Sequence, residues 1–372
     1  MLAPRERVLR AFSHKEVDRV PRDIGSTIVT TFTKNAYRNF LDYIKIKETY
    51  EIEDAFQGVV IPSEKVMQLL NIDFRRVGFS NRYDIIDYSY TDCCGIKYKR
   101  AFPHDYYDIF FNPLKDFDIN SILNYPWPKF EYDNKYKDLS LKAKDLYENS
   151  NYAIVGDLIL CGFNEFGQKL IGYENYFIDL IDNKNLIIKL FDILLEIQKN
   201  IWSHYLNAIG KNVHVICWGD DLGTQDRPQV SPKIFKELLK PYYKKMFSFI
   251  KERTDAKLFM HSCGDIYPYI EDLVESGVDI LNPVQINANE MEPKRLKNKF
   301  GDKLIFWGGV DIQFLLRSCG IEEVHKYVKD IVDIFGKDGG YVLSAAHNIQ
   351  EDIPPQNVFA LFNSGKNNNI FK

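Results

Sequence analysis

Short apolar segments bounded by turn-forming residues recur along the whole chain, and most stretches between them show helical periodicity. One such stretch, 321–335, places Val324, Val328, Ile331 and Ile334 three or four residues apart, as the buried face of a helix requires. The apolar segments cover residues 18–25, 74–79, 153–158, 213–218, 258–263, 278–282, 304–307 and 341–346. Eight strands that alternate with helices predict an α/β fold, specifically a closed parallel (β/α)8 TIM barrel.

A segment without helical periodicity interrupts this pattern after the second strand. Residues 80–128 are rich in Tyr, Asp and Thr, and they contain alternating runs such as Ile96-Lys97-Tyr98-Lys99-Arg100. Alternation with a period of two is typical of a half-buried strand. We therefore expect a β-rich insertion after the second strand, lying over the mouth of the barrel. One barrel with this insertion accounts for all 372 residues, so we expect a single domain, 1–372.

Charge and cysteine content exclude several classes of protein. The chain has 48 basic and 52 acidic residues, a net charge of −4, and no dense basic tract of the kind that binds nucleic acid. It has no apolar stretch of the roughly 20 residues that cross a bilayer, and its start does not resemble a secretory signal. The six cysteines do not form a disulfide framework. These features predict a cytoplasmic protein that acts on small molecules.

Three metal-binding side chains follow two of the predicted strands. His261 and Cys263 end the fifth strand, where positions i and i+2 point to the same side, so the imidazole and the thiol can converge on one ion. His347 ends the eighth strand. The carboxyl ends of all barrel strands meet at one rim. Three protein ligands with an open fourth position are typical of catalytic rather than structural zinc, so the sequence predicts a Zn²⁺ site here.

Polar groups also follow other predicted strands, and each has a structural explanation beside the functional one. Asp220 and Asp221, the predicted catalytic pair, could simply cap a helix. Alternatively, one of them could orient a ligating imidazole, act as an acid or base, or complete the metal shell. Asn282 precedes Pro283, and such a pair often forms a turn. The predicted substrate-binding residues are Glu165, Asn282, Gln285, Asp311, Gln313 and Asn348, the last of which would also flank the metal.

Seven short motifs together resemble the uroporphyrinogen decarboxylase superfamily, in particular its branch of methyltransferases that work with corrinoid proteins. The motifs occupy residues 5–12, 17–21, 218–223, 261–264, 281–285, 347–350 and 354–357, so the resemblance covers nearly the whole chain. It implies a TIM barrel, Zn²⁺ at His261 and Cys263, and a corrinoid (cobalamin) carried by a partner protein. The set of motifs is specific to the superfamily but not to one reaction.

Two departures from the family pattern narrow the expected function. The decarboxylases carry an arginine-containing stretch after the first strand that holds the propionates of the tetrapyrrole, whereas residues 23–31 of this chain contain no arginine. The zinc methyltransferases have a cysteine as third ligand, where this chain offers His347. Two imidazoles and one thiolate leave the zinc with a net positive charge, which makes it a better Lewis acid. This ligand set therefore favours a reaction on the methyl donor. Zinc would polarise the leaving heteroatom of a small methylated compound, such as an ether, and Co(I) corrinoid would take the methyl group.

Two other classes of function are compatible with the same residues. A metal-independent decarboxylase or other lyase would use Asp220 or Asp221 as its acid, and metal analysis of the purified protein separates it from a zinc methyltransferase. A catalytically silent binding module would bind a corrinoid protein without turnover. The sequence does not identify the methyl donor, the methyl acceptor or the direction of transfer.

Overall fold

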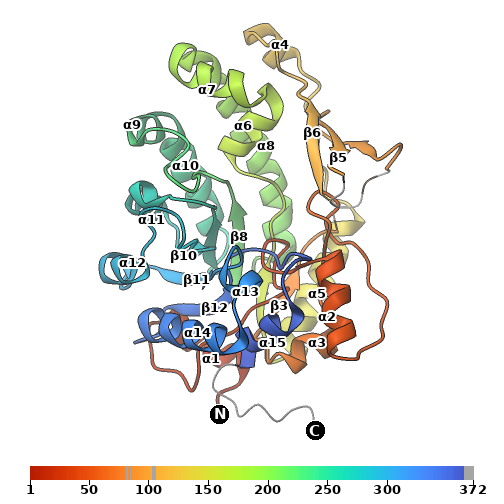
Figure 1. Ribbon diagram of the computed structural model, residues 1–372. Coiled ribbons are helices and arrows are strands. Elements are labelled where there is room, and N and C mark those ends of the chain that lie inside the picture. Colours follow the sequence, from red (N-terminus) through yellow and green to blue (C-terminus); the bar gives the residue numbers. More distant parts are fainter. Residues whose placement is uncertain (81–82, 84, 103–105, 364–372) are drawn as a thin grey trace.

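A curled sheet of seven parallel strands forms the centre of the computed structural model, which describes residues 1–80, 83, 85–102 and 106–363 (Figure 1). The strand order is β12-β11-β10-β9-β8-β7-β3, so neighbours in the sheet are also successive along the chain. The strands are β3 (Phe74–Val77), β7 (Ala153–Gly156), β8 (Val215–Gly219), β9 (Lys257–His261), β10 (Ile280–Asn282), β11 (Ile305–Val310) and β12 (Tyr341–Ala345). All seven lie where apolar segments predicted them.

Helices surround the sheet because each has one apolar face to bury against it. In α14 (Ile321–Phe335), Val324, Val328 and Ile331 are buried as their spacing predicted, whereas Ile334, the fourth residue of the predicted face, is only partly buried. The other helices are α1 (Pro4–Phe12), α2 (Lys34–Tyr43), α3 (Glu64–Leu69), α4 (Ile119–Asn124), α5 (Asn134–Asn149), α6 (Phe163–Ile171), α7 (Tyr173–Asp182), α8 (Lys184–Ile209), α9 (Pro232–Ile234) with a π-turn (Phe235–Leu239), α10 (Lys240–Lys251), a 3-10 turn (Tyr267–Tyr269), α11 (Ile270–Ser276), α12 (Pro293–Phe300), α13 (Leu315–Ser318) and α15 (Pro355–Asn363).

The predicted first strand, 18–25, is the exception, because only one β-bridge remains of it. Arg22 pairs with Leu343 of β12, where Asp23 N donates to Leu343 O (3.0 Å) and Leu343 N donates to the Pro21 carbonyl (2.8 Å). On the other side, Asp73 N, just before β3, donates to Arg22 O (3.0 Å). This short segment therefore joins the two edges of the sheet. Pro21 has no N–H to donate, which prevents a longer ladder on that side.

The predicted β-rich insertion is a three-stranded antiparallel sheet of β4 (Ser89–Thr91), β5 (Lys97–Arg100) and β6 (Tyr107–Phe111). A further small sheet pairs β1 (Phe32–Thr33) with β2 (Val59–Val60). The insertion contacts the sequence on both sides of it: Tyr107 N donates to Phe56 O (3.0 Å), and Asn112 Nδ2 donates to Lys169 O of α6 (2.9 Å). These bonds hold the insertion beside the carboxyl ends of the sheet strands.

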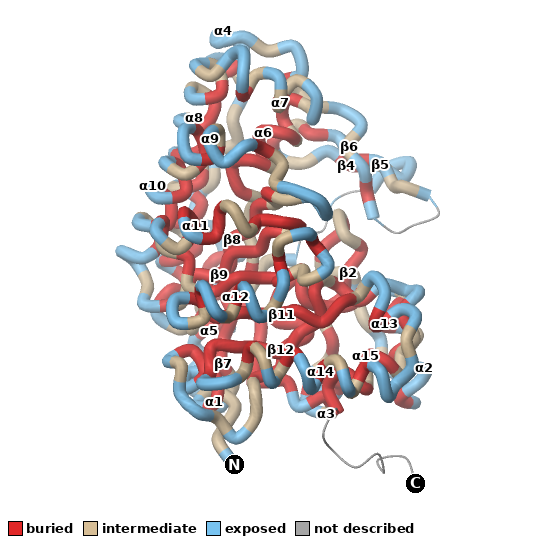
Figure 2. Tube along the Cα trace, turned by 60° about the vertical axis from the view of Figure 1, so that its left-hand side comes forward, coloured by how far each residue is buried: buried red, intermediate tan, exposed pale blue. Residues whose placement is uncertain are grey.

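Apolar side chains fill the amino-terminal half of the space inside the curled sheet. The indole of Trp307 lies with its ring centroid 4.4 Å from that of Phe74 and 5.2 Å from that of Phe259, and Phe12 of α1 covers them from below. Buried residues accordingly follow the strands in Figure 2, while the outer faces of the helices are exposed. Because this half is packed, a ligand inside the curled sheet must bind at the carboxyl ends of the strands.

Candidate metal centre

The three predicted metal ligands meet at the carboxyl ends of the strands. The donor atoms of His261, Cys263 and His347 all lie within 4.8 Å of one another, although β9 and β12 are separated by two intervening strands. His261 Nε2 lies 3.6 Å from Cys263 Sγ. A tetrahedral zinc ion, with bonds of about 2.1 Å to nitrogen and about 2.3 Å to sulfur, separates two such atoms by about 3.6 Å. The donor set therefore fits a zinc ion in its chemistry, and the His261–Cys263 pair also fits it in spacing.

Burial has opposite effects on the imidazole of His347 and the thiol of Cys263 as candidate ligands. Burial, and then the neighbouring His261 ring, lowers the pKa of His347 to about 4, so its imidazole is neutral at physiological pH and its lone pair is available. Burial also raises the pKa of the Cys263 thiol. A divalent cation reverses this effect because it stabilises the thiolate that binds it. The thiol thus becomes a full ligand only together with the metal.

Asn282 orients the His261 ring. Its side-chain oxygen lies 2.5 Å from His261 Nδ1, while its Nδ2 donates to the Trp307 carbonyl (3.0 Å) and so defines which amide atom faces the ring. Because an amide oxygen only accepts, Nδ1 carries the proton and Nε2 is left to bind the metal. Asn282 is fully buried behind the ring and does not line the main cavity, the space at the strand ends that His261 and His347 line. The structure thus gives it a contact with a metal ligand rather than with the cavity.

We expect Asn282→Ala to weaken zinc binding by about 10–100-fold, because losing a partner that orients a ligating histidine typically has that effect. Zinc affinity can be measured by competition with a chromogenic chelator. Asn357→Ala is a matched control, since buried Asn357 also donates to backbone carbonyls, of Leu316 and Cys319, but far from the triad. Equal zinc affinities in the two variants would contradict the assignment.

The adjacent carboxylates of Asp220 and Asp221 lie in different surroundings. Asp220 is fully buried and accepts hydrogen bonds from the backbone N–H groups of Asn164 (2.9 Å) and Glu165 (2.8 Å) and from the Tyr243 hydroxyl (2.6 Å). It therefore caps the first turn of α6 from the neighbouring strand end. A Cβ atom at Gly162 would lie 2.2 Å from its carboxylate, so this close approach requires glycine there. Asp220 does not line the main cavity.

Asp221, in contrast, faces the cavity beside the triad. Its Oδ1 accepts from the backbone N–H of Cys263 (2.8 Å), and its own N–H donates to Glu165 Oε2 (3.3 Å). Both carboxylates line the cavity that His261 and His347 also line. Asp221 and Glu165 are thus acidic groups of this cavity that lie beside the candidate metal ligands.

Of the remaining predicted residues, one lines the cavity, two hold nearby loops through hydrogen bonds, and one lies outside the cavity. Asn348 lines the cavity next to His347, where it accepts from Thr31 N (2.8 Å) and donates to Ile28 O (2.9 Å). Gln285 accepts from Gly264 N (2.9 Å) and so holds the loop after Cys263. Asp311 accepts from three backbone N–H groups, those of Gln313, Phe314 and Leu315, at the start of α13. Gln313 is exposed and lies outside the cavity.

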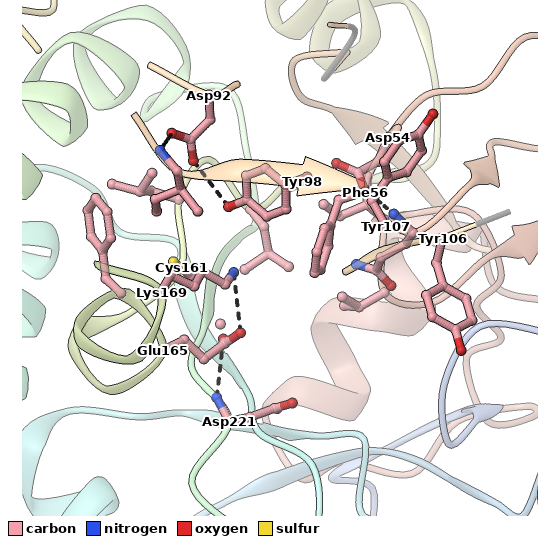
Figure 3. Close-up of a pocket in the computed structure, with 18 of the residues that line it drawn as sticks. Asp54, Phe56, Asp92, Tyr98, Tyr106, Tyr107, Cys161, Glu165, Lys169 and Asp221 are labelled. Carbon is pink, nitrogen blue, oxygen red and sulfur yellow. Dashed lines mark hydrogen bonds and ion pairs between the residues drawn. The ribbon is translucent and has the colours of Figure 1, made fainter. Parts of the chain in front are cut away.

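The main cavity has a volume of about 480 Å³ and lies between the strand ends and the insertion (Figure 3). Several of its residues were not predicted from the sequence. Lys169 lies 3.5 Å from Glu165 Oε1 and 5.1 Å from the Phe56 ring centroid. The Tyr98 hydroxyl donates to Asp92 (3.1 Å) on the insertion. The i, i+4 spacing of Glu165 and Lys169 on one helix was the available signal for the first pair.

Comparisons with known proteins relate the chain to one enzyme family and one solved fold. The family model described as uroporphyrinogen decarboxylase (URO-D) matches residues 166–367. A curated uroporphyrinogen decarboxylase from Shewanella denitrificans is 28% identical over 96 residues, which is 26% of this chain and 25% of the relative, so the match spans a quarter of that protein. A solved methyltransferase from Methanosarcina mazei has a similar fold, with a TM-score of 0.69, 16% identity and 98% coverage of both chains. No helix among the described residues is long and apolar enough to cross a membrane.

Proposed function

Because this chain belongs to the uroporphyrinogen decarboxylase family, we propose that it is a zinc-dependent methyltransferase that moves a methyl group between a small methylated compound and a corrinoid on a partner protein. The observation that carries the proposal is the convergence of His261, Cys263 and His347 within 4.8 Å at the edge of a cavity. Three ligands leave a fourth position for a substrate atom, as catalytic zinc requires. The Methanosarcina methyltransferase of similar fold supports the same reaction class.

The residues of the chain have distinct roles in this proposal. When bound, zinc supplies Lewis acidity toward the leaving heteroatom of the methyl donor. Asn282 keeps His261 Nε2 directed at the metal, and Asp220 holds α6 in place. Asp221 and Glu165 face the cavity, where they hydrogen-bond the substrate or the product that leaves. In the transfer, the bond between carbon and heteroatom breaks with its electron pair on the heteroatom, which later takes a proton from solvent, and Co(I) provides the pair for the new bond to carbon.

The lining of the cavity disfavours the decarboxylation of a porphyrinogen. Among the described residues that line it, Lys169 is the only lysine or arginine, and it already lies beside Glu165. A tetrapyrrole with eight carboxylates needs several cationic partners to offset its desolvation. A metal-independent lyase acting on a smaller acid remains the alternative reading, and it predicts full activity in metal-free protein.

The test compares both directions of methyl transfer. The purified protein is assayed for zinc, then for demethylation of neutral ethers and thioethers with cob(I)alamin, and separately for methylation of a thiol by methylcobalamin. Our proposal predicts demethylation that is lost after chelation and restored by Zn²⁺. Thiol methylation alone would contradict the direction of transfer, and activity that survives the complete removal of zinc would contradict the metal centre.

A further inference from the structure

A second cavity lies on the other side of the Glu165–Lys169 pair. It has a volume of about 410 Å³, within the range of small-molecule sites. Its lining shares Glu165, Lys169 and Asp221 with the main cavity, and exposed Tyr173 lies at its rim. Three side chains that line two cavities form the wall between them. The main cavity, which His261 and His347 line, is thus separated from a second space only by this wall.

Long contacts join Glu165 to the other two residues of this wall, whereas Asp221 is held by the 2.8 Å bond from Cys263 N to its Oδ1. Lys169 Nζ lies 3.5 Å from Glu165 Oε1, and the Asp221 N–H reaches Glu165 Oε2 at 3.3 Å, both longer than a strong charge-assisted hydrogen bond. The backbone below them is firmly held, since Asp220 caps α6 and the Cβ of any residue other than glycine at position 167 would lie 2.4 Å from the Tyr176 ring. Rotation of the Glu165 and Lys169 side chains would therefore connect the cavities while the helix stays still.

The second cavity differs from the main one in its chemistry. Apart from the shared wall, its described lining is neutral: Ile109, Asn112, Gln168, Tyr173 and Gln229. The Gln229 side-chain oxygen already accepts from Asn164 Nδ2 (2.9 Å) and Gln168 Nε2 (2.9 Å), so its amide N–H groups are the donors that remain for a ligand. Amides and a hydroxyl satisfy a neutral hydrogen-bonding molecule but do not offset the desolvation of a charged one.

We propose that this second cavity admits and binds the small methylated substrate, a neutral ether, alcohol or amide, and that Glu165 and Lys169 form the gate to the metal centre. This inference rests on the methyltransferase function proposed above. Donor and acceptor approach a transferred methyl carbon from opposite sides, so two separate approaches to one metal suit the reaction. The main cavity, which is bounded by the insertion, is then left for the corrinoid.

A tryptophan at position 109 tests the route without any need for turnover. Ile109 lies on β6 and lines the second cavity, whereas its neighbour Phe110 is 56% exposed and lines neither cavity. Ile109→Trp is therefore expected to fill the second cavity, and Phe110→Trp is its control. Leu160→Trp is expected to fill the main cavity, which Leu160 lines. The reporter is Cys263 in metal-stripped protein, whose alkylation is followed by mass spectrometry of its peptide. Iodoacetamide and iodoacetate serve as neutral and anionic probes of similar size.

We expect Ile109→Trp in the Leu160→Trp background to slow the reaction of Cys263 with iodoacetamide by about tenfold relative to Phe110→Trp in the same background, because the gated route is then closed as well. Iodoacetate should show no such difference. Equal rates with iodoacetamide would overturn the inference. Ile109→Phe replaces the tryptophan variant if circular dichroism shows that the latter is unfolded.

Kinetics separate this inference from the proposed function. In active enzyme, Ile109→Trp should raise the KM for 2-methoxyethanol by about tenfold while the KM for cob(I)alamin stays constant, because only one approach is blocked. A wild-type protein without any demethylation would contradict the proposed function, yet the alkylation rates would still decide whether the second cavity leads to the metal centre. An Ile109→Trp variant that raises both KM values equally would count against two separate approaches.

Discussion

Replacing His347 with alanine should lower zinc affinity by more than about 100-fold, because even the loss of a group that only orients a ligand costs 10–100-fold. Two ligands, His261 and Cys263, would remain, and the raised pKa of the Cys263 thiol favours its protonated form when no cation is held near it. Demethylation should fall with zinc occupancy. Competition with a chromogenic chelator gives the affinity, and metal analysis gives the occupancy.

His325 provides the matched control, since it lies on α14 away from the strand ends. His325→Ala should keep wild-type zinc content, and unchanged zinc affinity in His347→Ala would rule out the triad. The variant His347→Cys tests the role of ligand charge. It should retain zinc but slow demethylation by about tenfold, because a second thiolate removes the net positive charge and weakens the Lewis acid. Demethylation that is as fast with cysteine as with histidine would contradict that argument.

Replacing Arg76 with methionine should cost about 3–5 kcal/mol of unfolding free energy, because it leaves a buried carboxylate without its cation. Arg76 Nε lies 2.5 Å from Asp157 Oδ2, and the Asp157 side chain is fully buried between β3 and β7. Asp157 also accepts hydrogen bonds from Leu158 N (2.7 Å) and Ile28 N (3.1 Å), and both residues line the main cavity. Denaturant titration gives the stability, and the loss should also loosen this wall of the site.

Lowering the pH should reduce the loss of unfolding free energy in Arg76→Met, and this pH dependence distinguishes a charge effect from a packing effect. Burial raises the pKa of Asp157 even in the wild type, and without Arg76 the pKa rises further. A carboxyl group whose pKa in the folded state exceeds its unfolded value destabilises the fold progressively as pH rises between those two values. The deficit of Arg76→Met should therefore shrink as the pH is lowered from 7 toward 5. An equal deficit at both pH values would show that lost packing, rather than charge, is responsible.

Two further variants complete the comparison. Arg76→Met combined with Asp157→Asn should recover much of the stability, because the fully buried carboxylate is then removed with its cation and only Glu53, the partly exposed second partner of Arg76, keeps its charge. Lys144→Met removes an exposed ion pair with Glu148, whose two side chains are 61% and 56% exposed and 3.9 Å apart. That change should alter stability by less than about 0.5 kcal/mol, as is usual for solvent-exposed pairs.

The positions of seven strands and the convergence of the metal ligands could be predicted because both follow from short-range patterns and one topological rule. Apolar runs mark buried parallel strands, and the rule that carboxyl ends share one rim brings His261 and His347 together from β9 and β12. The predicted first strand was wrong as a full strand. Its segment carries the right apolar pattern, but Pro21 and Gly25, with φ of +92°, limit it to one bridge.

The sequence by itself therefore determined the order of strands and helices, the family pattern and the set of candidate metal ligands. Only the tertiary structure decided that Asp221 rather than Asp220 faces the cavity, that Asn282 holds His261, and that Lys169 belongs to the wall between two cavities. The physical reason is that the hydrogen-bond partners are distant in sequence. Asn164 is 56 residues from Asp220, and Trp307 is 25 residues from Asn282. Local patterns determine where a strand ends, whereas packing between distant segments determines which way each polar side chain at that end points.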